Sequence, residues 1–494
     1  MKATVGLTLL FLAWTASADV RPSAAAADSP TVVPASGGGG VPLIFGHFDD
    51  LDAIGYRGAE FFISGDAHSY MAATPLANDG KWNVTPDPTT APYTTRAIVH
   101  TPKNARKFNG TVYVEWLNVS GLVDASPDWV HGHLQIAREG AAYVGVSAQL
   151  AGINQLKNGG IAPGDPVRYA PLVHPGDSYS YDIYSQVGQA IRDGRLLGGL
   201  AVRRVLAIGE SQSAGRLVTY IDGVHPLVDV YDGFLVHSRN VGAALRESPL
   251  PPISVSFADI RDDLDVPVIV FQSELDVAFG TLLTRQPETR SGRFRLWEVA
   301  GTAHYDEYGL TIGLTDIGDG QGEIANLAAM QDPPTEPEPG LIECALPINT
   351  GPMHWVFNAA VHWIDRWVKY GTPPPIAPRL EATSPPGAPV VFAVDEHGNT
   401  LGGIRTPLVD APIARLAGSG NTGAPGGPPT SMFCFLFGQT VPFDDAELAA
   451  LYPSHASFVS RYYLAGVSAV NSQFLLQPDA DALLRAAVQS DIRR

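Results

Sequence analysis

Residues 205–220 read Val-Leu-Ala-Ile-Gly-Glu-Ser-Gln-Ser-Ala-Gly-Arg-Leu-Val-Thr-Tyr: an apolar run, a Gly-x-Ser-x-Ser turn and a stretch of helical character. A strand that enters a helix through so tight a turn leaves little room for side chains, which explains the small Gly209 and Ser213 on either side of Ser211. The turn lifts the Ser211 hydroxyl above the edge of the sheet. It also places the backbone N–H of Gln212 beside that hydroxyl, at a helix start that favours negative charge. The stretch therefore predicts a nucleophilic serine, with an ordinary turn as the alternative.

Segments of strand and helix character alternate on both sides of this turn. Strands are predicted at 59–63, 95–100, 111–116, 142–147, 204–208, 230–236, 266–271 and 294–299, and helices at 129–139, 180–191 and 214–224. Segment 266–271, Val-Pro-Val-Ile-Val-Phe, is apolar throughout, as in a strand that is buried on both faces. Such alternation predicts an α/β fold with a mostly parallel sheet and helices on both of its faces.

Two carboxylates and a histidine follow the last two of these strands. A serine hydroxyl is a weak nucleophile until a base removes its proton, and the base needs a carboxylate to orient it. Gln-Ser-Glu-Leu-Asp, with Glu274 and Asp276, follows the first of the two strands, and Ala-Gly-Thr-Ala-His, ending in His304, follows the second. Enzymes built on this turn have the chain order Ser, acid, His. We predict the triad Ser211, Asp276 and His304. Asp276 is preferred over Glu274 because the acid usually lies at the far end of this loop, and Glu274 is the alternative acid.

An oxyanion hole needs two backbone N–H donors, one after the nucleophile and one from the loop after the third core strand. Gln212 supplies the first. The second is expected in the loop Leu-Asn-Val-Ser-Gly at 117–121, and we assign it to Asn118. Ser213 is interpreted as a substitute for glycine in the turn rather than as a rival nucleophile.

The composition of the 494-residue chain, 45% hydrophobic and 17% charged, is typical of a globular protein. Its formal net charge of −18 argues against nucleic acid and anionic membrane surfaces as partners. No phosphate-binding or dinucleotide-binding fingerprint is present, and His131 and His133 complete no known metal spacing. A serine triad needs neither, so we expect no cofactor and no metal; the oligomeric state is left open.

The first 18 residues have the pattern of a secretory signal: Met-Lys, an apolar stretch at 3–16, and Ala-Ser-Ala at 16–18. The apolar stretch is short for a membrane anchor, and no later segment is apolar enough to cross a bilayer. We therefore expect a secreted or periplasmic protein without a stable membrane anchor. Residues 19–40, with runs of four alanines and four glycines, are expected to form a flexible leader.

The predicted core spans 41–310, and the remainder, 311–494, is predicted to pack on it as a C-terminal extension. A strong helix candidate at 353–370 is expected to complete or cover the core, and further helices are expected at 444–465 and 480–492. We expect the substrate pocket to be lined by 402–407 or by the tyrosine-rich stretch near Tyr181.

The two cysteines, Cys344 and Cys434, fit an exported protein as one disulfide that would pin the extension. Two buried free thiols are the alternative.

Four stretches resemble a bacterial family of secreted α/β-hydrolase-domain proteins. They are Val-Glu-Trp-Leu-Asn-Val-Ser-Gly at 114–121, Val-Gly-Val-Ser-Ala-Gln at 144–149, Gly-Glu-Ser-Gln-Ser-Ala-Gly at 209–215 and Trp-Glu-Val-Ala-Gly-Thr-Ala-His at 297–304. With weaker matches in the extension, the resemblance covers nearly all of 41–463. It implies an α/β-hydrolase fold with an eight-stranded sheet and a serine-hydrolase mechanism, and it implies no substrate because the family is mostly uncharacterised.

Together the residues predict a hydrolase that cleaves carboxylic esters, small or polymer-derived, through an acyl-enzyme on Ser211. A lactonase, an amidase or an acyltransferase would use the same residues. A binding module on a catalytically inactive hydrolase scaffold is the alternative from another class of protein.

Overall fold

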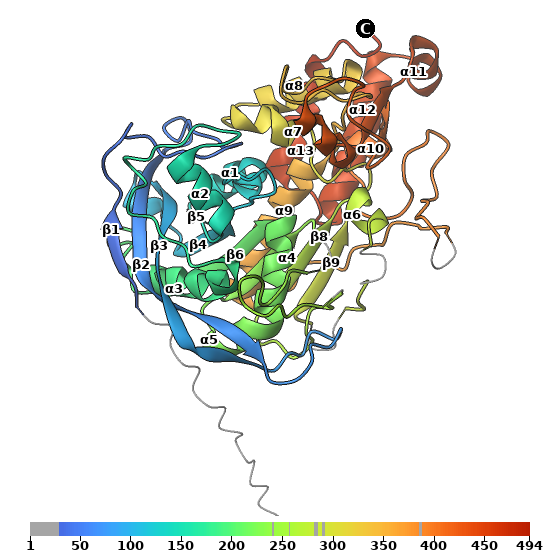
Figure 1. Ribbon diagram of the computed structural model, residues 1–494. Coiled ribbons are helices and arrows are strands. Elements are labelled where there is room, and N and C mark those ends of the chain that lie inside the picture. The colour runs from blue at the N-terminus through green and yellow to red at the C-terminus, as the bar shows by residue number, and fades with distance from the viewer. Residues whose placement is uncertain (1–28, 240–241, 256, 281–284, 289–291, 385–387) are drawn as a thin grey trace, which may run out of the picture.

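A nine-stranded sheet forms the centre of the computed structural model, which describes residues 29–239, 242–255, 257–280, 285–288, 292–384 and 388–494 (Figure 1). The strand order is β1-β2-β3-β5-β4-β6-β7-β8-β9. The strands are β1 (Thr31–Pro34), β2 (Tyr56–Ala72), β3 (Val84–Pro102), β4 (Thr111–Trp116), β5 (Ala142–Val146), β6 (Arg204–Glu210), β7 (Gly233–His237), β8 (Val268–Gln272) and β9 (Phe294–Glu298). The predicted signal segment lies outside the described residues.

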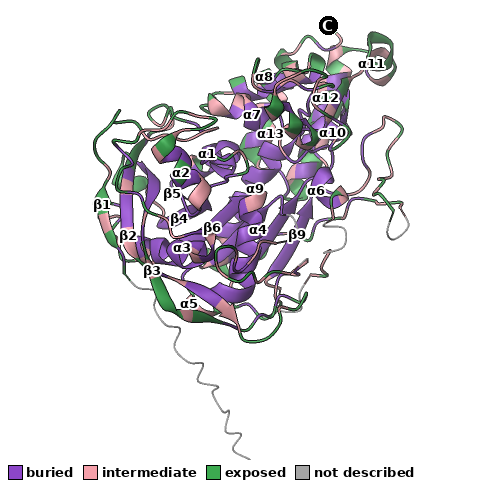
Figure 2. Ribbon diagram, in the orientation of Figure 1, coloured by how far each residue is buried: buried purple, intermediate pink, exposed green. Residues whose placement is uncertain are grey.

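Six strands, β5, β4, β6, β7, β8 and β9 in sheet order, run parallel to one another. Strands β1, β2 and β3 pair antiparallel, and β3 joins β5 antiparallel. Strands β4, β5, β7, β8 and β9 are buried along their whole length (Figure 2). Burial on both faces is why β5 and β8 are apolar almost throughout rather than alternating. The predicted α/β architecture with a mostly parallel sheet is confirmed.

The sheet has nine strands, not the eight that the resemblance implied, and the additional strand, β1, comes from the segment expected to be a flexible leader. Thr31 to Pro34 pairs with β2, from Thr31 opposite Ser64 to Pro34 opposite Phe61. The prediction of a leader without structure is therefore wrong for these four residues. Thr-Val-Val-Pro carries two valines suited to a strand, and the free edge of the long β2–β3 hairpin supplies the backbone partners that the segment lacks by itself.

Helices cover both faces of the sheet, and each face has its own apolar cluster. One face packs against α3 (Ser180–Arg192), α4 (Gln212–Thr219), the π-helical turn η3 (Tyr220–Val224) and α5 (His225–Val228). The other packs against α1 (Pro127–Glu139) and α9 (Met353–Tyr370). Because α9 contacts β6, β7 and β8, the C-terminal part of the chain supplies a layer of the core.

The remaining helices of the extension gather at one end of the molecule (Figure 1). They are α8 (Gln321–Gln331), α10 (Pro407–Asp410), α11 (Asp445–Leu451), α12 (His455–Asn471) and α13 (Gln477–Gln489), beside the two-stranded sheet β10 (Ala414–Ala417) and β11 (Gln439–Pro442). The other short elements are η1 (Ala105–Lys107), α2 (Leu150–Asn158), η2 (Asp177–Tyr179), α6 (Glu274–Ala278), α7 (Glu307–Leu310), η5 (Ile312–Leu314) and η6 (Pro429–Leu436).

The single helix predicted at 444–465 is wrong, because the chain forms two helices there, α11 and α12. Pro453 lies between them, where it lacks the N–H that a continuous helix requires. Ser454 then begins α12, accepting a hydrogen bond from the N–H of Ser457.

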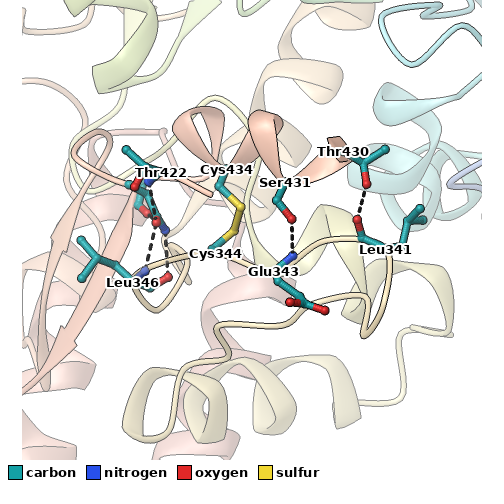
Figure 3. The surroundings of a disulfide bond; sticks show 10 residues. Leu341, Glu343, Cys344, Leu346, Thr422, Thr430, Ser431 and Cys434 are labelled. Atoms are coloured by element: carbon teal, nitrogen blue, oxygen red, sulfur yellow. Dashed lines mark hydrogen bonds between the residues drawn. A yellow bond between two sulfur atoms is a disulfide. The ribbon is translucent and has the colours of Figure 1, made fainter. Parts of the chain in front are cut away.

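Cys344 and Cys434 form the predicted disulfide, with their Cα atoms 5.5 Å apart (Figure 3). It joins the loop after α8 to the 3-10 helix η6, two segments 90 residues apart in the sequence. Both sulfur-bearing side chains lie in a small apolar cluster with Leu310, Ile348 and Phe437.

Candidate active site

Ser211 lies on the turn between β6 and α4 in a conformation that few non-glycine residues adopt, with φ 58° and ψ −116°. A Cβ on Gly209 would lie 3.1 Å from Leu217 Cδ1 and 3.4 Å from Ser213 Cβ, so strand and helix touch here. The Ser213 hydroxyl donates to the backbone carbonyl of Glu210 at 2.9 Å. The tight turn predicted from the sequence is present, and Ser213 closes it.

His304 lies between the serine and a carboxylate. Its Nδ1–H donates to Asp276 Oδ1 at 2.5 Å, and the Ser211 hydroxyl donates to its Nε2 at 2.7 Å. The other oxygen of Asp276 accepts from the N–H of Ser273 at 2.7 Å and from its hydroxyl at 2.8 Å. Because a carboxylate only accepts, this arrangement fixes the proton on Nδ1 and leaves the lone pair of Nε2 toward the serine.

Glu274, the alternative acid, is buried on the other side of the same turn. Its two oxygens accept from the backbone N–H groups of Gly301 at 2.6 Å and Gly418 at 2.8 Å. Glu274 thus ties the loop that carries His304 to the extension, and Asp276 alone of the two carboxylates contacts the imidazole.

Glu210, directly before the serine, is a site residue that sequence reasoning missed. Its Oε1 lies 3.2 Å from His304 Nε2, and its side chain is 5% exposed. A contact between these two atoms is favourable only when a proton lies between them, on the imidazole or on the carboxyl group. The sequence did offer a signal for Glu210, because this acidic residue ends a central strand directly before the predicted nucleophile.

The pKa values of these groups depend on each other. Burial alone would lower the pKa of His304, but the charges of Asp276 and Glu210 outweigh burial and raise it to about 9. Burial raises the pKa of Glu210 to about 8, although the imidazole opposes this shift. Burial would also raise the pKa of Asp276, but the imidazole and the bonds from Ser273 lower it below its ordinary value. The site therefore favours the protonated form of His304, and the neutral ring that can accept the serine proton predominates only above this raised pKa.

Asn118 lines the cavity, but its backbone N–H does not serve as the predicted oxyanion donor. Its backbone N–H donates to the Ala125 carbonyl at 2.9 Å, so this N–H is not available for an oxyanion. Its side-chain amide donates instead to Glu210, to the backbone carbonyl at 3.0 Å and to Oε2 at 3.1 Å. Asn118 therefore positions Glu210, and within the described chain the N–H groups of Val119 and Gly121 are the loop donors without an acceptor.

Gln212 is the first residue of α4, two residues before the helix start predicted at 214. The first N–H groups of a helix have no acceptor within the helix, so the Gln212 N–H remains available beside the Ser211 hydroxyl.

A cavity of about 180 Å³ contains Ser211 and His304 in its wall. The other residues that line it are mostly apolar: Phe45, Gly46, Asn118, Ser120, Gly121, Val123, Ala125, Pro127, Ile161, Glu210, Tyr305, Gly309, Leu310, Glu338, Leu341, Ile342, Thr430, Phe433, Leu436 and Phe437. The prediction that 402–407 or the stretch near Tyr181 lines the pocket is wrong. Ile404 instead bonds to Glu298 and Ala300 beside the histidine loop, and Tyr181 packs in the core under the sheet.

Two further features of the described residues bear on the sequence predictions. They contain no group of three or more His, Cys, Asp or Glu side chains arranged to hold a metal ion. Among the same residues, no helix combines the length and the apolar character needed to cross a membrane.

Three solved structures with some similarity to the chain share 12–15% sequence identity with it. A putative dienelactone hydrolase from Klebsiella pneumoniae is 13% identical, with 54% of this chain and 97% of that chain covered and a TM-score of 0.29. The esterase Est22 is 15% identical, with 57% and 83% covered and a TM-score of 0.32. A putative acetyl xylan esterase from Bacteroides fragilis is 12% identical, with 55% and 70% covered and a TM-score of 0.28. At this level of similarity these structures carry no argument about the chemistry of the chain.

No curated protein matches the chain in a sequence search. Among families, the alpha/beta hydrolase domain family matches residues 22–485, which is nearly the whole sequence and includes β1, the core and the extension. The parallel sheet, the strand-to-helix turn at Ser211 and this match agree, and the chain belongs to the alpha/beta hydrolase domain family.

Proposed function

We propose that the protein is a serine hydrolase that cleaves carboxylic esters. The observation that carries the proposal is the line of contacts from Ser211 Oγ to His304 Nε2, 2.7 Å, and from His304 Nδ1 to Asp276 Oδ1, 2.5 Å. Three groups at these distances are suited to turning a serine hydroxyl into a nucleophile.

In the proposed reaction, Ser211 Oγ attacks the ester carbonyl while His304 Nε2 takes the hydroxyl proton. The Gln212 N–H donates to the oxyanion, and Asp276 holds the imidazolium by its Nδ1–H. His304 then gives the proton to the leaving alcohol. Water, deprotonated by the same imidazole, cleaves the acyl-enzyme, releases the carboxylic acid and restores Ser211.

A fluorophosphonate probe tests this proposal, because it reacts with activated serines. We expect one adduct, located on Ser211 by peptide mass spectrometry, and loss of both the adduct and p-nitrophenyl acetate hydrolysis in Ser211→Ala. The matched control is Ser213→Ala, two residues along the same turn, which should still be labelled. Labelling or hydrolysis that persists in Ser211→Ala would refute the proposal.

The products distinguish hydrolysis from the related reactions. With an added acceptor alcohol, a hydrolase releases mainly the free acid, whereas an acyltransferase forms the new ester. Turnover of a lactone or an amide in place of open-chain esters would assign the same residues to a lactonase or an amidase.

We also infer export to the periplasm or the medium. The disulfide supports this inference, since disulfides persist in oxidising compartments. N-terminal sequencing of the mature protein should give a start near Asp19; a start at Met1 in protein recovered from the cytoplasm would contradict it.

A further inference from the structure

Two segments of the extension form one wall of the cavity above Ser211 and His304. They are residues 338–344 and 430–437, named here the flap. Leu341, Ile342, Phe433, Leu436 and Phe437 line the cavity from the flap. The part of the site that contacts the substrate away from the reacting carbonyl is therefore apolar on this side.

The two segments of the flap are joined to each other at several points (Figure 3). The Cys344–Cys434 disulfide links them covalently. Beside it, the Thr430 hydroxyl donates to the Leu341 carbonyl, and the Glu343 N–H donates to the Ser431 hydroxyl at 2.9 Å. These links hold the apolar side chains of the flap in one arrangement, so little ordering is left for the substrate to impose.

The flap is also fixed relative to the reacting groups. The N–H of Tyr305, the residue after His304, donates to the Leu436 carbonyl at 3.3 Å, and the N–H of Asn349 donates to the Phe437 carbonyl at 2.8 Å. The Asn349 side chain in turn donates to the carbonyl of Gly301 in the histidine loop at 3.1 Å. The apolar wall and the imidazole are thus parts of one bonded unit.

The lining of the cavity contains acidic side chains but no lysine or arginine among the described residues. Glu210 and Glu338 contribute the carboxyl groups. An anionic substrate group would lose its water and meet no lysine or arginine in this described lining, and the imidazole in the wall, His304, is already bonded to Asp276 and Ser211. Such burial of a charge is costly in an apolar site. An uncharged apolar group instead gains free energy from burial.

We propose that the flap is the specificity element of this site and that it binds an uncharged aliphatic or aromatic group of the ester. This inference rests on the proposed function, because it concerns the substrate of the same serine.

Chain-length series give the first measurement. One series varies the acyl group of p-nitrophenyl esters from acetyl to butyryl and hexanoyl, and the other varies the alcohol of acetate esters from ethyl to butyl and hexyl. In at least one series kcat/KM should rise by about fourfold for each added methylene, until the cavity is full. The series that responds identifies which side of the ester contacts the flap. A flat response in both series overturns the inference.

A pair of phenylalanine variants in η6 gives the second measurement. Phe433 lines the cavity, whereas Phe435, two residues away, is 39% exposed and contacts the ring of Phe279 instead. In Phe433→Ala the ratio of kcat/KM for the longest to the shortest responsive ester should fall by about tenfold, the effect of losing about 50 Å² of apolar contact. Phe435→Ala should keep the wild-type ratio. Equal ratios in both variants overturn the inference.

Leu341→Ala repeats this test on the other segment of the flap, in case Phe433→Ala folds poorly, and urea unfolding reports the folding of each variant. Leu341 lines the cavity. In Leu341→Ala the ratio of kcat/KM for the longest to the shortest responsive ester should also fall. An unchanged ratio in folded Leu341→Ala overturns the inference.

A charged ester gives the third measurement. The p-nitrophenyl monoester of a dicarboxylic acid should be turned over at least about tenfold more slowly than the equally long uncharged ester, because its carboxylate finds no lysine or arginine along the flap. Equal turnover overturns the inference. These results separate the two proposals: hydrolysis that persists in Ser211→Ala refutes the proposed function, whereas hydrolysis that depends on Ser211 but ignores chain length and charge refutes the flap alone.

Discussion

The imidazole of His304 contacts two acidic side chains, Asp276 at Nδ1 and Glu210 near Nε2. Asp276 holds the ring when it is neutral and when it is protonated. Glu210 contacts the nitrogen that takes up the serine proton, so its contact is strongest when the imidazolium forms. Asn118 keeps the Glu210 carboxyl in place by donating to its Oε2. We therefore regard Glu210 as a positioning residue that stabilises the protonated base.

Replacing Glu210 by glutamine tests this interpretation through the pH profile. Neutral His304 is the base, so kcat/KM should rise with pH through the pKa of His304, which the neighbouring carboxylates raise to about 9. Glu210→Gln removes one source of that shift, and the acid limb should move to lower pH. At the plateau kcat should fall by about tenfold, the loss of one hydrogen bond to a charged group.

The control for this prediction is Glu338→Gln, which removes a carboxyl group from the wall of the same cavity. Its acid limb should coincide with that of the wild type. If Glu210→Gln gives the same acid limb as the wild type, Glu210 does not act on His304.

The two carboxylates of the loop after β8 should separate in their effects. Asp276→Asn should lower kcat by about a thousandfold or more, because the amide no longer holds the Nδ1–H tautomer. Glu274→Gln should leave kcat within about threefold but lower the free energy of unfolding by about 1–3 kcal/mol, since one buried N–H of Gly301 or Gly418 loses its acceptor. Steady-state kinetics and urea unfolding measure the two effects, and the opposite pattern would make Glu274 the acid.

Among the elements, the turn between β6 and α4 depends on close contact of strand and helix. In Gly209→Ala, the new Cβ lies 3.1 Å from Leu217 Cδ1. We expect a loss of about 1–3 kcal/mol in unfolding free energy and a lower kcat, because relief of this contact moves Ser211. Gly160→Ala is the control, since its Cβ meets nothing within 4 Å. Equal stability and kcat in the two variants would contradict the requirement for glycine.

How far the elements were predictable depends on how local their signals are. The parallel strands after β3 and helices such as α9 were predictable from single segments. A strand buried on both faces is apolar throughout, and a helix buried along one stripe has apolar residues at helical spacing. Segment 31–34 becomes a strand only through the edge of β2, a partner distant in sequence. The break between α11 and α12 had a local signal in Pro453, which the helical pattern around it outweighed.

At the site, the sequence predicted which groups would meet but not the hydrogen bonds between them. The order Ser211, Asp276, His304 follows from chain position, and all three side chains meet in the structure. The Asn118 N–H bonds to the Ala125 carbonyl, and Glu210 approaches His304. Both contacts depend on how two loops pack together, and no spacing in the sequence predicts such packing.

At the scale of the whole molecule, the extension forms part of the candidate active site. It supplies α9 to one face of the sheet, bonds to the histidine loop through Asn349 and Gly418, and forms the flap. A boundary at residue 310 therefore divides the sequence but not the folded unit. Loss of order in the extension should reach the catalytic groups as well as the pocket.

Removing the disulfide tests this coupling. The Cys344–Cys434 link closes a loop of 90 residues, and the chain-entropy estimate for such a loop is a stabilisation of about 3–5 kcal/mol. The double variant Cys344→Ser, Cys434→Ser should unfold at correspondingly lower urea concentration. Because the flap is bonded to the histidine loop, hydrolysis should be lost over the same urea range in which tryptophan fluorescence reports unfolding of the core. Dithiothreitol should shift the wild type toward the variant and leave the variant unchanged. An unaltered midpoint in the variant, or activity lost well before the fluorescence change, would show that the extension and the core unfold separately.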